Sequence, residues 1–230
     1  MAQKRRPKNY VEEGHHRTLS GNVYVDSRKR TRIQHGRDID TREWDGQAEL
    51  DLLRDACPKD FWTFFLYAFG AGANPKGKRW IDHTVHEPLA RWFEGHVLEW
   101  HNARKKGVGK QKHLAVVVHR EIGKTTMITE AGQLWLHLLD PELSSYTGSE
   151  RLELSMKMLG AIKGVMDGSD PYALFSRLYG NWSTEARSWT GKDVIHAAKK
   201  NTSRTDPSFG TFAVETSIVA FCFDIDSNFV

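Results

Sequence analysis

The side chains whose types and spacing could perform chemistry are concentrated in one short stretch of the chain. It reads His-Arg-Glu-Ile-Gly-Lys-Thr-Thr over residues 119–126. A turn that binds nucleotide phosphates needs a glycine that lets the backbone approach the anion, a lysine that reaches the β- and γ-phosphates, and a threonine that ligates Mg²⁺. Gly123, Lys124 and Thr125 supply these groups in that order. The stretch therefore predicts a site for ATP and Mg²⁺.

The elements on either side of this turn have the order that a phosphate-binding site requires. Residues 114–118, Leu-Ala-Val-Val-Val, predict a fully buried strand in the middle of a parallel sheet. Residues 127–139 predict a helix, which Asp-Pro at 140–141 ends. A helix that starts at such a turn points its first N–H groups at the phosphate. We expect the nucleotide to contact seven consecutive residues: Arg120, Glu121, Ile122, Gly123, Lys124, Thr125 and Thr126.

One position departs from the full phosphate-binding motif, which has another glycine five residues before Gly123. That position is Val118. The alternative interpretation is a surface turn in which Lys124 only caps the start of a helix. The strand and helix predicted around the turn favour phosphate binding over this alternative.

The elements that must position this turn are helices before it and an α/β pattern after it. Residues 48–69 and 86–103 carry apolar and aromatic side chains at helical spacing. The aromatic residues from 61 to 69 suit one buried face, so we interpret them as core and not as a platform for stacking bases. After the turn, a helix is expected over residues 151–166, and strands are expected near residues 143–147, 194–197 and 211–214. This alternation predicts an α/β fold in which helices flank a mostly parallel sheet.

Composition divides the chain into a basic N-terminal tail, residues 1–47, and a globular region, residues 48–230. Residues 1–36 contain nine Lys or Arg against three acids, a net charge of +6. Such a tail attracts polyanions without folding first, which predicts nucleic-acid binding; the alternative is a solvated, flexible terminus. Within the globular region we expect a helical lead-in over residues 48–112 and the sheet core over residues 113–230.

Hydropathy and cysteine usage bound the setting in which the chain works. No stretch approaches the length of uninterrupted apolar sequence that a membrane span needs, and no apolar segment follows the basic N-terminus. Cys57 and Cys222 lie far apart and form no disulfide framework. We therefore expect a soluble protein that is not secreted and contacts no membrane.

Further motifs follow the turn in a specific order: Leu-Ser-Ser-Tyr-Thr at 143–147, Gly-Ser-Glu at 148–150, Phe-Ser-Arg-Leu-Tyr-Gly-Asn-Trp at 175–182, Trp189, Asp-Pro-Ser at 206–208 and Val-Glu-Thr-Ser at 214–217. Arg120 stands three residues before Gly123. In this order and spacing, residues 60–220 resemble the ATPase domain of the large terminase subunits of tailed bacteriophages. That family tolerates a phosphate-binding turn without its first glycine and has an arginine at the position of Arg120.

The resemblance implies a P-loop NTPase fold and an ATPase that drives viral DNA packaging in the host cytoplasm. It implies that Arg120 stabilises the γ-phosphate and acts with Lys124 in catalysis, as a permanently charged guanidinium can. The alternative for Arg120 is a salt bridge with Glu121. The partners that the resemblance implies are double-stranded DNA, a portal protein, a small terminase subunit and further copies of the chain in a ring.

The sequence leaves open which acidic residues would support ATP hydrolysis. The apolar run over residues 218–223 ends at Asp224, which makes Asp224 a candidate Mg²⁺ ligand. By the family's spacing, however, the acidic pair falls near the end of the chain, so we expect a truncated C-terminus and no nuclease domain. Two alternatives follow: a helicase-like P-loop DNA translocase, or a catalytically incomplete remnant that binds nucleotide or DNA without turnover.

Overall fold

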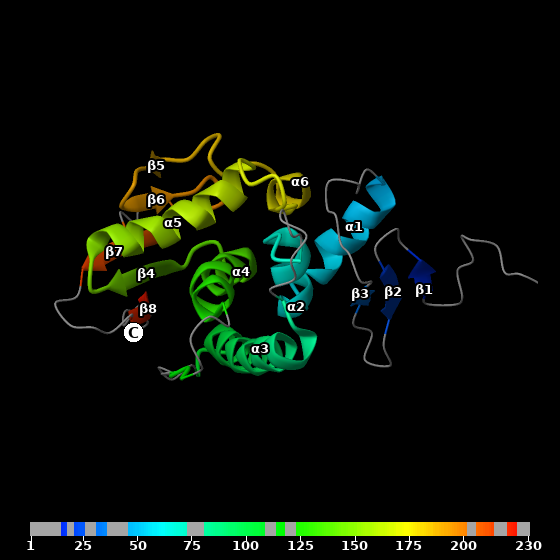
Figure 1. The fold of residues 1–230 in the computed structure, drawn as a ribbon. Coiled ribbons are helices and arrows are strands. Elements are labelled where there is room, and N and C mark those ends of the chain that lie inside the picture. Colours follow the sequence, from blue (N-terminus) through cyan, green and yellow to red (C-terminus); the bar gives the residue numbers. More distant parts are fainter. Residues whose placement is uncertain are drawn as a thin grey trace, which may run out of the picture.

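The computed structural model describes residues 15–17, 21–25, 31–35, 46–72, 81–108, 114–117, 123–201, 206–213 and 220–224. Figure 1 shows the helices and strands that these residues form. Within this part of the chain, no helix has both the length and the apolar composition that crossing a membrane requires.

Helical segments precede the phosphate-binding turn, as predicted: α1 (Gln47–Ala56), α2 (Phe61–Thr63), the π-helical η2 (Phe64–Ala68) and α3 (His83–Lys105). Aspartates begin two of them. The Asp60 side chain accepts a hydrogen bond from Thr63 N at 2.8 Å, and the Asp82 side chain accepts one from Thr84 N at 2.8 Å. Such side chains satisfy N–H groups that have no partner within a helix, which is why α2 and α3 start at these residues.

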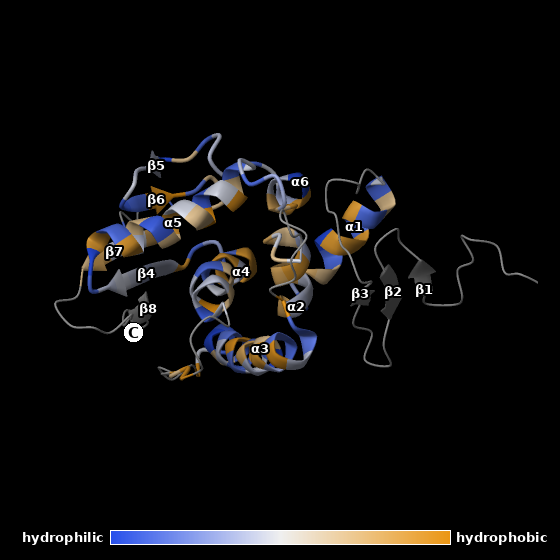
Figure 2. Ribbon diagram, in the orientation of Figure 1, coloured by the Kyte–Doolittle hydropathy of each residue, from blue (hydrophilic) through white to orange (hydrophobic). Residues whose placement is uncertain are grey.

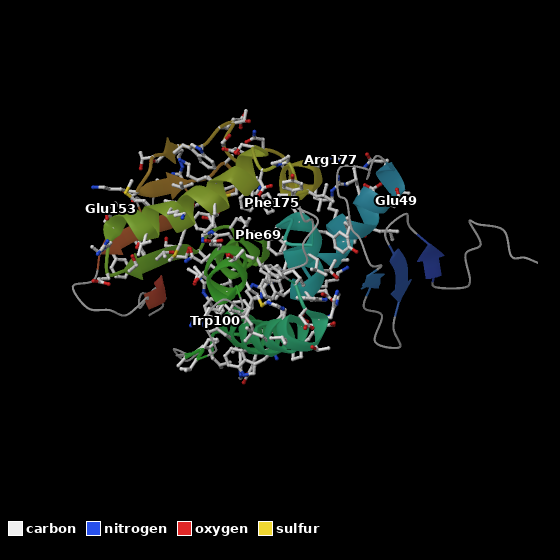
Figure 3. All side chains as sticks on the ribbon, in the orientation of Figure 1. Glu49, Phe69, Trp100, Glu153, Phe175 and Arg177 are labelled. Carbon is white, nitrogen blue, oxygen red and sulfur yellow. The ribbon has the colours of Figure 1, made fainter. Side chains whose placement is uncertain are left out.

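The aromatic residues of α2 and η2 form the centre of the core, which confirms their interpretation as buried packing residues. The ring centroid of Phe61 lies 5.0 Å from that of Phe93 on α3 and 5.1 Å from that of Trp135. Trp135 Nε1 also donates a hydrogen bond to Cys57 O at 2.8 Å. Figure 2 shows apolar residues on α2, α3 and α4 (Gly132–Leu139) in this region. Figure 3 shows the labelled side chain of Phe175 in the same interior, where it is fully buried.

The main sheet contains five strands in the spatial order β5 (Ser188–Trp189), β6 (Asp193–Ile195), β7 (Phe209–Ala213), β4 (Ser144–Ser149) and β8 (Ala220–Asp224). Only β4 and β7 pair in parallel, whereas the β4–β8, β5–β6 and β6–β7 pairs are antiparallel. The fold is therefore α/β, but the prediction of a mostly parallel sheet is wrong. One reason is the turn between β5 and β6, where Lys192 N and Asp193 N donate to Thr190 Oγ1, because strands joined by so short a turn pair antiparallel.

Four helical segments accompany this sheet: η3 (Thr125–Ala131), α4 (Gly132–Leu139), α5 (Leu152–Asp167) and α6 (Phe175–Tyr179). α5 packs along the parallel strands β4 and β7, as Figure 1 shows. It ends at Gly168, whose φ of 78° is a left-handed conformation that glycine adopts without strain. The helix predicted over residues 151–166 is confirmed.

Residues 114–117 do not form the buried central strand that their apolar side chains predict. They adopt no regular structure, and the side chains of Leu114 and Val117 are 40% and 94% exposed. The prediction is wrong over these residues, while Val118 lies outside the described residues. β4 pairs with β7 on one side and with β8 on the other, so this segment does not lie beside β4 in the sheet.

A second, separate sheet lies near the N-terminus and was not part of the sequence prediction. Its strands are β1 (His15–Arg17), β2 (Gly21–Val25) and β3 (Thr31–His35), which pair antiparallel in chain order. Basic residues occur on these strands, among them Arg17 in β1 and Arg32 in β3.

Candidate nucleotide-binding site

The predicted phosphate-binding turn is described from Gly123 onwards. Gly123 has a φ of 66°, a left-handed conformation that side chains disfavour, so a glycine is suited to this position. Its carbonyl oxygen accepts a hydrogen bond from Met127 N at 2.9 Å, which closes the first turn of the helix. Lys124, Thr125 and Thr126 follow in this first turn and are partly exposed. The first N–H groups of a helix have no partner within it, which makes such a turn suitable for an anion.

The helix that begins here is π-helical over η3 and continues as α4. Gly132 N donates to Met127 O, five residues earlier, so the wider winding reaches the end of η3. Segments of π-helix are rare and occur frequently at functional sites. The residues that follow the turn are therefore wound differently from the ordinary helix that their sequence predicts.

Two side-chain contacts define how this helix lies against β4. Gln133 Nε2 donates to Thr147 Oγ1, and one helical turn later His137 Nε2 lies 3.0 Å from Ser145 Oγ. These two contacts pack α4 against Thr147 and Ser145 of β4.

The carboxyl ends of β4 and β7 are joined to the start of α5 by hydroxyl groups. Ser155 Oγ lies 3.1 Å from Ser149 Oγ and 3.1 Å from Phe212 O. Ser149 and Ser155 are both fully buried. Because β4 and β7 are parallel and in register, their carboxyl ends lie side by side at the same end of the sheet. This is the side of a sheet where α/β proteins bind their ligands.

A carboxylate near the turn was missed by the sequence analysis. Glu130 lies on η3, one turn after Thr126. Burial raises the pKa of Glu130 to about 7, while a hydrogen bond with the Thr126 side chain and the charge of Lys157 on α5 act in the opposite direction. No sequence signal marks Glu130, because its burial arises only when α5 packs against η3. A group that titrates near neutral pH therefore lies close to the candidate phosphate site.

The structure brings only part of the predicted site together. Gly123, Lys124, Thr125 and Thr126 are consecutive in the turn and first helical turn, whereas Arg120, Glu121 and Ile122 lie outside the described residues. Asp224 ends β8 and is paired with Ser144 in the antiparallel register, at the amino end of β4. The length of β4, roughly 17 Å, separates this position from Ser149. The backbone therefore places Asp224 at the amino end of β4.

A chain of buried polar side chains holds the helix against the sheet and was also missed. Beyond the Gln133 and His137 contacts, Ser145 Oγ donates to Gln133 Oε1 at 3.3 Å, and His196 Nε2 lies 3.2 Å from His137 Nδ1. All these side chains are almost completely buried. Burial lowers the pKa of His196 to about 3 and also lowers the pKa of His137, so both imidazoles are neutral. The spacing of Gln133 and His137, four residues apart in an apolar helix, is the signal that could have indicated this network.

Searches of protein-family models, curated proteins and solved structures found no match to the chain. The residues of the turn nevertheless suit a nucleotide. A left-handed glycine, a helix N-terminus and an adjacent lysine and threonine are compatible with a phosphate and its Mg²⁺ ion.

Proposed function

We propose that the chain binds ATP with Mg²⁺ at the turn formed by Gly123, Lys124 and Thr125, as the ATPase domain of a viral DNA-packaging terminase large subunit. The observation that supports this proposal is the conformation of the turn. Gly123 has a left-handed φ of 66° and leads directly into the first turn of a helix. A phosphate at this position is stabilised by the first N–H groups and by the positive end of the helix dipole.

The side chains of the turn have distinct roles in this proposal. The Lys124 ammonium group attracts the β- and γ-phosphates, and the Thr125 hydroxyl is a ligand for Mg²⁺. Bound Mg²⁺ supplies positive charge that offsets the charge of the phosphates. Arg120 adds a second cation at the γ-phosphate, as the resemblance to terminases implies. The role of Gly123 is conformational, because its left-handed backbone leaves space for the phosphate.

The assignment to DNA packaging rests on the ordered motifs over residues 60–220 and on the basic N-terminal segment. In this proposal the chain acts on double-stranded DNA together with a portal protein, a small terminase subunit and further copies of itself in a ring. The basic segment adds an electrostatic contribution to DNA binding, which weakens as salt concentration rises.

One observation favours a second candidate function, namely nucleotide binding without hydrolysis. Hydrolysis needs a carboxylate that holds Mg²⁺ beside the phosphates. Asp224, the candidate for this role, is paired with Ser144 at the amino end of β4, whereas α/β proteins bind their ligands at the carboxyl ends of strands. A chain with Lys124 and Thr125 but no carboxylate at the site would retain affinity for ATP and lack turnover.

The test compares ATP binding and phosphate release by the chain with those of Lys124→Ala, each with Mg²⁺ and with or without double-stranded DNA. Lys59→Ala is the matched control, because Lys59 is an exposed lysine remote from the turn in sequence. We expect Lys124→Ala to weaken ATP binding by at least about tenfold and Lys59→Ala to leave it unchanged. If both lysine variants bind ATP as the parent chain does, the proposal fails.

Phosphate release separates the two candidate functions. Turnover that Lys124→Ala abolishes supports the ATPase, and Asp224→Asn then tests whether Asp224 contributes to it. Binding that depends on Lys124 without any phosphate release supports the second candidate. Stimulation of turnover by double-stranded DNA distinguishes a DNA motor from an ATPase with another substrate.

A further inference from the structure

A carboxyl group contacts one of the residues that are expected to bind the nucleotide. Glu130 lies one turn after Thr126 on η3, and the two side chains form a hydrogen bond. Thr126 is partly exposed in the first helical turn, so its hydroxyl is open to a second partner from solvent. Glu130 is therefore only one hydrogen bond removed from an anion that Thr126 binds.

The surroundings of Glu130 compensate its negative charge only weakly. The charge of Lys157 on α5 acts on it, but Lys157 is itself exposed to solvent. On α3, which also packs against η3, the buried Glu94 is already paired with Arg91. On α4, which continues the same helix, His137 is neutral because it is buried. Burial of Glu130 outweighs the charge of Lys157 and raises the pKa of Glu130 to about 7.

The protonation state of Glu130 decides what the Thr126 hydroxyl offers to an anion. A threonine hydroxyl has one proton to donate and two lone pairs that accept. An ionised carboxylate can only accept, so ionised Glu130 takes the Thr126 proton and leaves lone pairs toward the anion. A protonated Glu130 can instead donate to Thr126 Oγ1, which frees the Thr126 proton for a phosphate oxygen. The ionised form also repels the phosphate charge, so both effects favour an anion on the protonated form.

We propose that Glu130 is a positioning residue for the nucleotide: in its protonated form it donates to Thr126 Oγ1 and so directs the Thr126 hydroxyl proton to a phosphate oxygen of ATP. The inference rests on the proposed ATP site. It couples ATP binding to the uptake of a proton, which moves from solvent to the Glu130 carboxylate when the phosphate binds. ATP affinity should therefore be constant at low pH and fall above neutrality, by up to about tenfold per pH unit.

Isothermal titration calorimetry of ATP with saturating Mg²⁺ between pH 6.5 and 8.5 tests the coupling. The affinity of the parent chain should fall by at least about tenfold over this range. Glu130→Gln should keep the low-pH affinity throughout, because an uncharged amide donates to Thr126 Oγ1 at every pH. The titration of ATP itself is common to both proteins, so the ratio of their affinities is the measured quantity. Glu185→Gln is the matched control, since Glu185 is an exposed glutamate between α6 and β5, and it should follow the parent.

Two further measurements separate positioning from packing. Titrations near pH 7 in buffers of different ionisation enthalpy should show that the parent takes up about half a proton more than Glu130→Gln when ATP binds. Thr126→Val, which lacks the hydroxyl, should bind ATP more weakly at pH 6.5 and lose much of the pH dependence, whereas Thr126→Ser should restore both. A role of Glu130 in packing alone would change neither proton uptake nor the pH profile.

The outcomes distinguish this inference from the proposed function. If ATP binding depends on Lys124 but Glu130→Gln follows the pH profile of the parent, the role of Glu130 is refuted and the ATP site stands. The same holds if Thr126→Val binds ATP as the parent does at pH 6.5. If the parent chain binds no ATP at any pH, the proposed function and this inference both fail.

Discussion

Arg91 offers the sharpest test of what holds the helical lead-in together, because it neutralises buried carboxylates from two segments. Its guanidinium lies 2.9 Å from Asp60 Oδ2, 3.0 Å from Glu94 Oε2 and 3.2 Å from Glu87 Oε1. The side chains of Asp60 and Glu94 are only 6% and 8% exposed. Glu94 also accepts a hydrogen bond from Phe61 N at 3.1 Å, which ties α3 to the start of α2.

The substitution Arg91→Met keeps most of the side-chain length and removes the cation. It leaves two nearly buried carboxylates without their common partner, which costs about 3–5 kcal/mol of unfolding free energy near pH 7. Burial and the neighbouring Asp60 already raise the pKa of Glu94, and Arg91 lowers it. Without Arg91 this pKa rises further, so the folded variant holds a proton that the unfolded chain releases. The deficit is therefore smallest at low pH and grows as pH rises above the pKa of an ordinary glutamate.

The assay is urea denaturation followed by tryptophan fluorescence at several pH values. Two comparisons sharpen it. Arg91→Met combined with Glu94→Gln should recover at least about 1 kcal/mol, since one uncompensated charge is removed. Asp51→Asn, which breaks an ion pair with Arg54 whose side chains are 43% and 54% exposed, should cost less than about 1 kcal/mol. The reasoning is refuted if Arg91→Met costs no more than Asp51→Asn, or if its deficit does not grow with pH.

Three further predictions concern groups that the tertiary structure buries or constrains. Glu130→Gln should have little effect on the melting temperature near pH 4, raise it increasingly between about pH 5 and pH 7, and give its full gain above pH 7. With a folded-state pKa of about 7, the parent chain keeps a proton that the unfolded chain releases, so the parent loses stability as pH rises from the ordinary glutamate pKa to about 7. In the parent chain, stability should fall as pH drops below about 6.5, because the unfolded chain protonates its histidines while buried His137 and His196 stay neutral. His196→Phe should make the melting temperature fall less steeply with decreasing pH, and an unchanged pH dependence in thermal melts would contradict this prediction. Gly70→Ala should lower the free energy of unfolding by at least about 2 kcal/mol in denaturant titrations. Gly70 has a φ of 85°, and an added Cβ would lie 2.7 Å from the backbone of Tyr172. An unchanged free energy of unfolding would show that this loop can move.

Local sequence signals were sufficient to predict where the helical elements lie. The spacing of aromatic residues between 61 and 69 predicts a buried helical face, and the structure buries Phe61, Phe64 and Phe65 completely. The helix over residues 151–166 is correct to within one residue at each end. These predictions succeed because helices form from contacts between residues three and four positions apart, which the sequence displays directly. The phosphate-binding turn itself remains a prediction from residue types and order.

The strands and the polar contacts depended on the tertiary structure. An apolar run such as residues 114–117 has the composition of a strand, but whether it becomes one depends on pairing with a strand elsewhere in the chain, and β4 pairs with β7 and β8 instead. The raised pKa of Glu130 and the neutral pair His137 and His196 have the same origin, since burial and hydrogen bonds from distant segments determine their charge. The sequence by itself determined which residues are chemically able to bind a phosphate and which helices surround them. Only the tertiary structure decided strand pairing, burial and the position of Asp224 at the amino end of β4, because these depend on segments that are far apart in the chain.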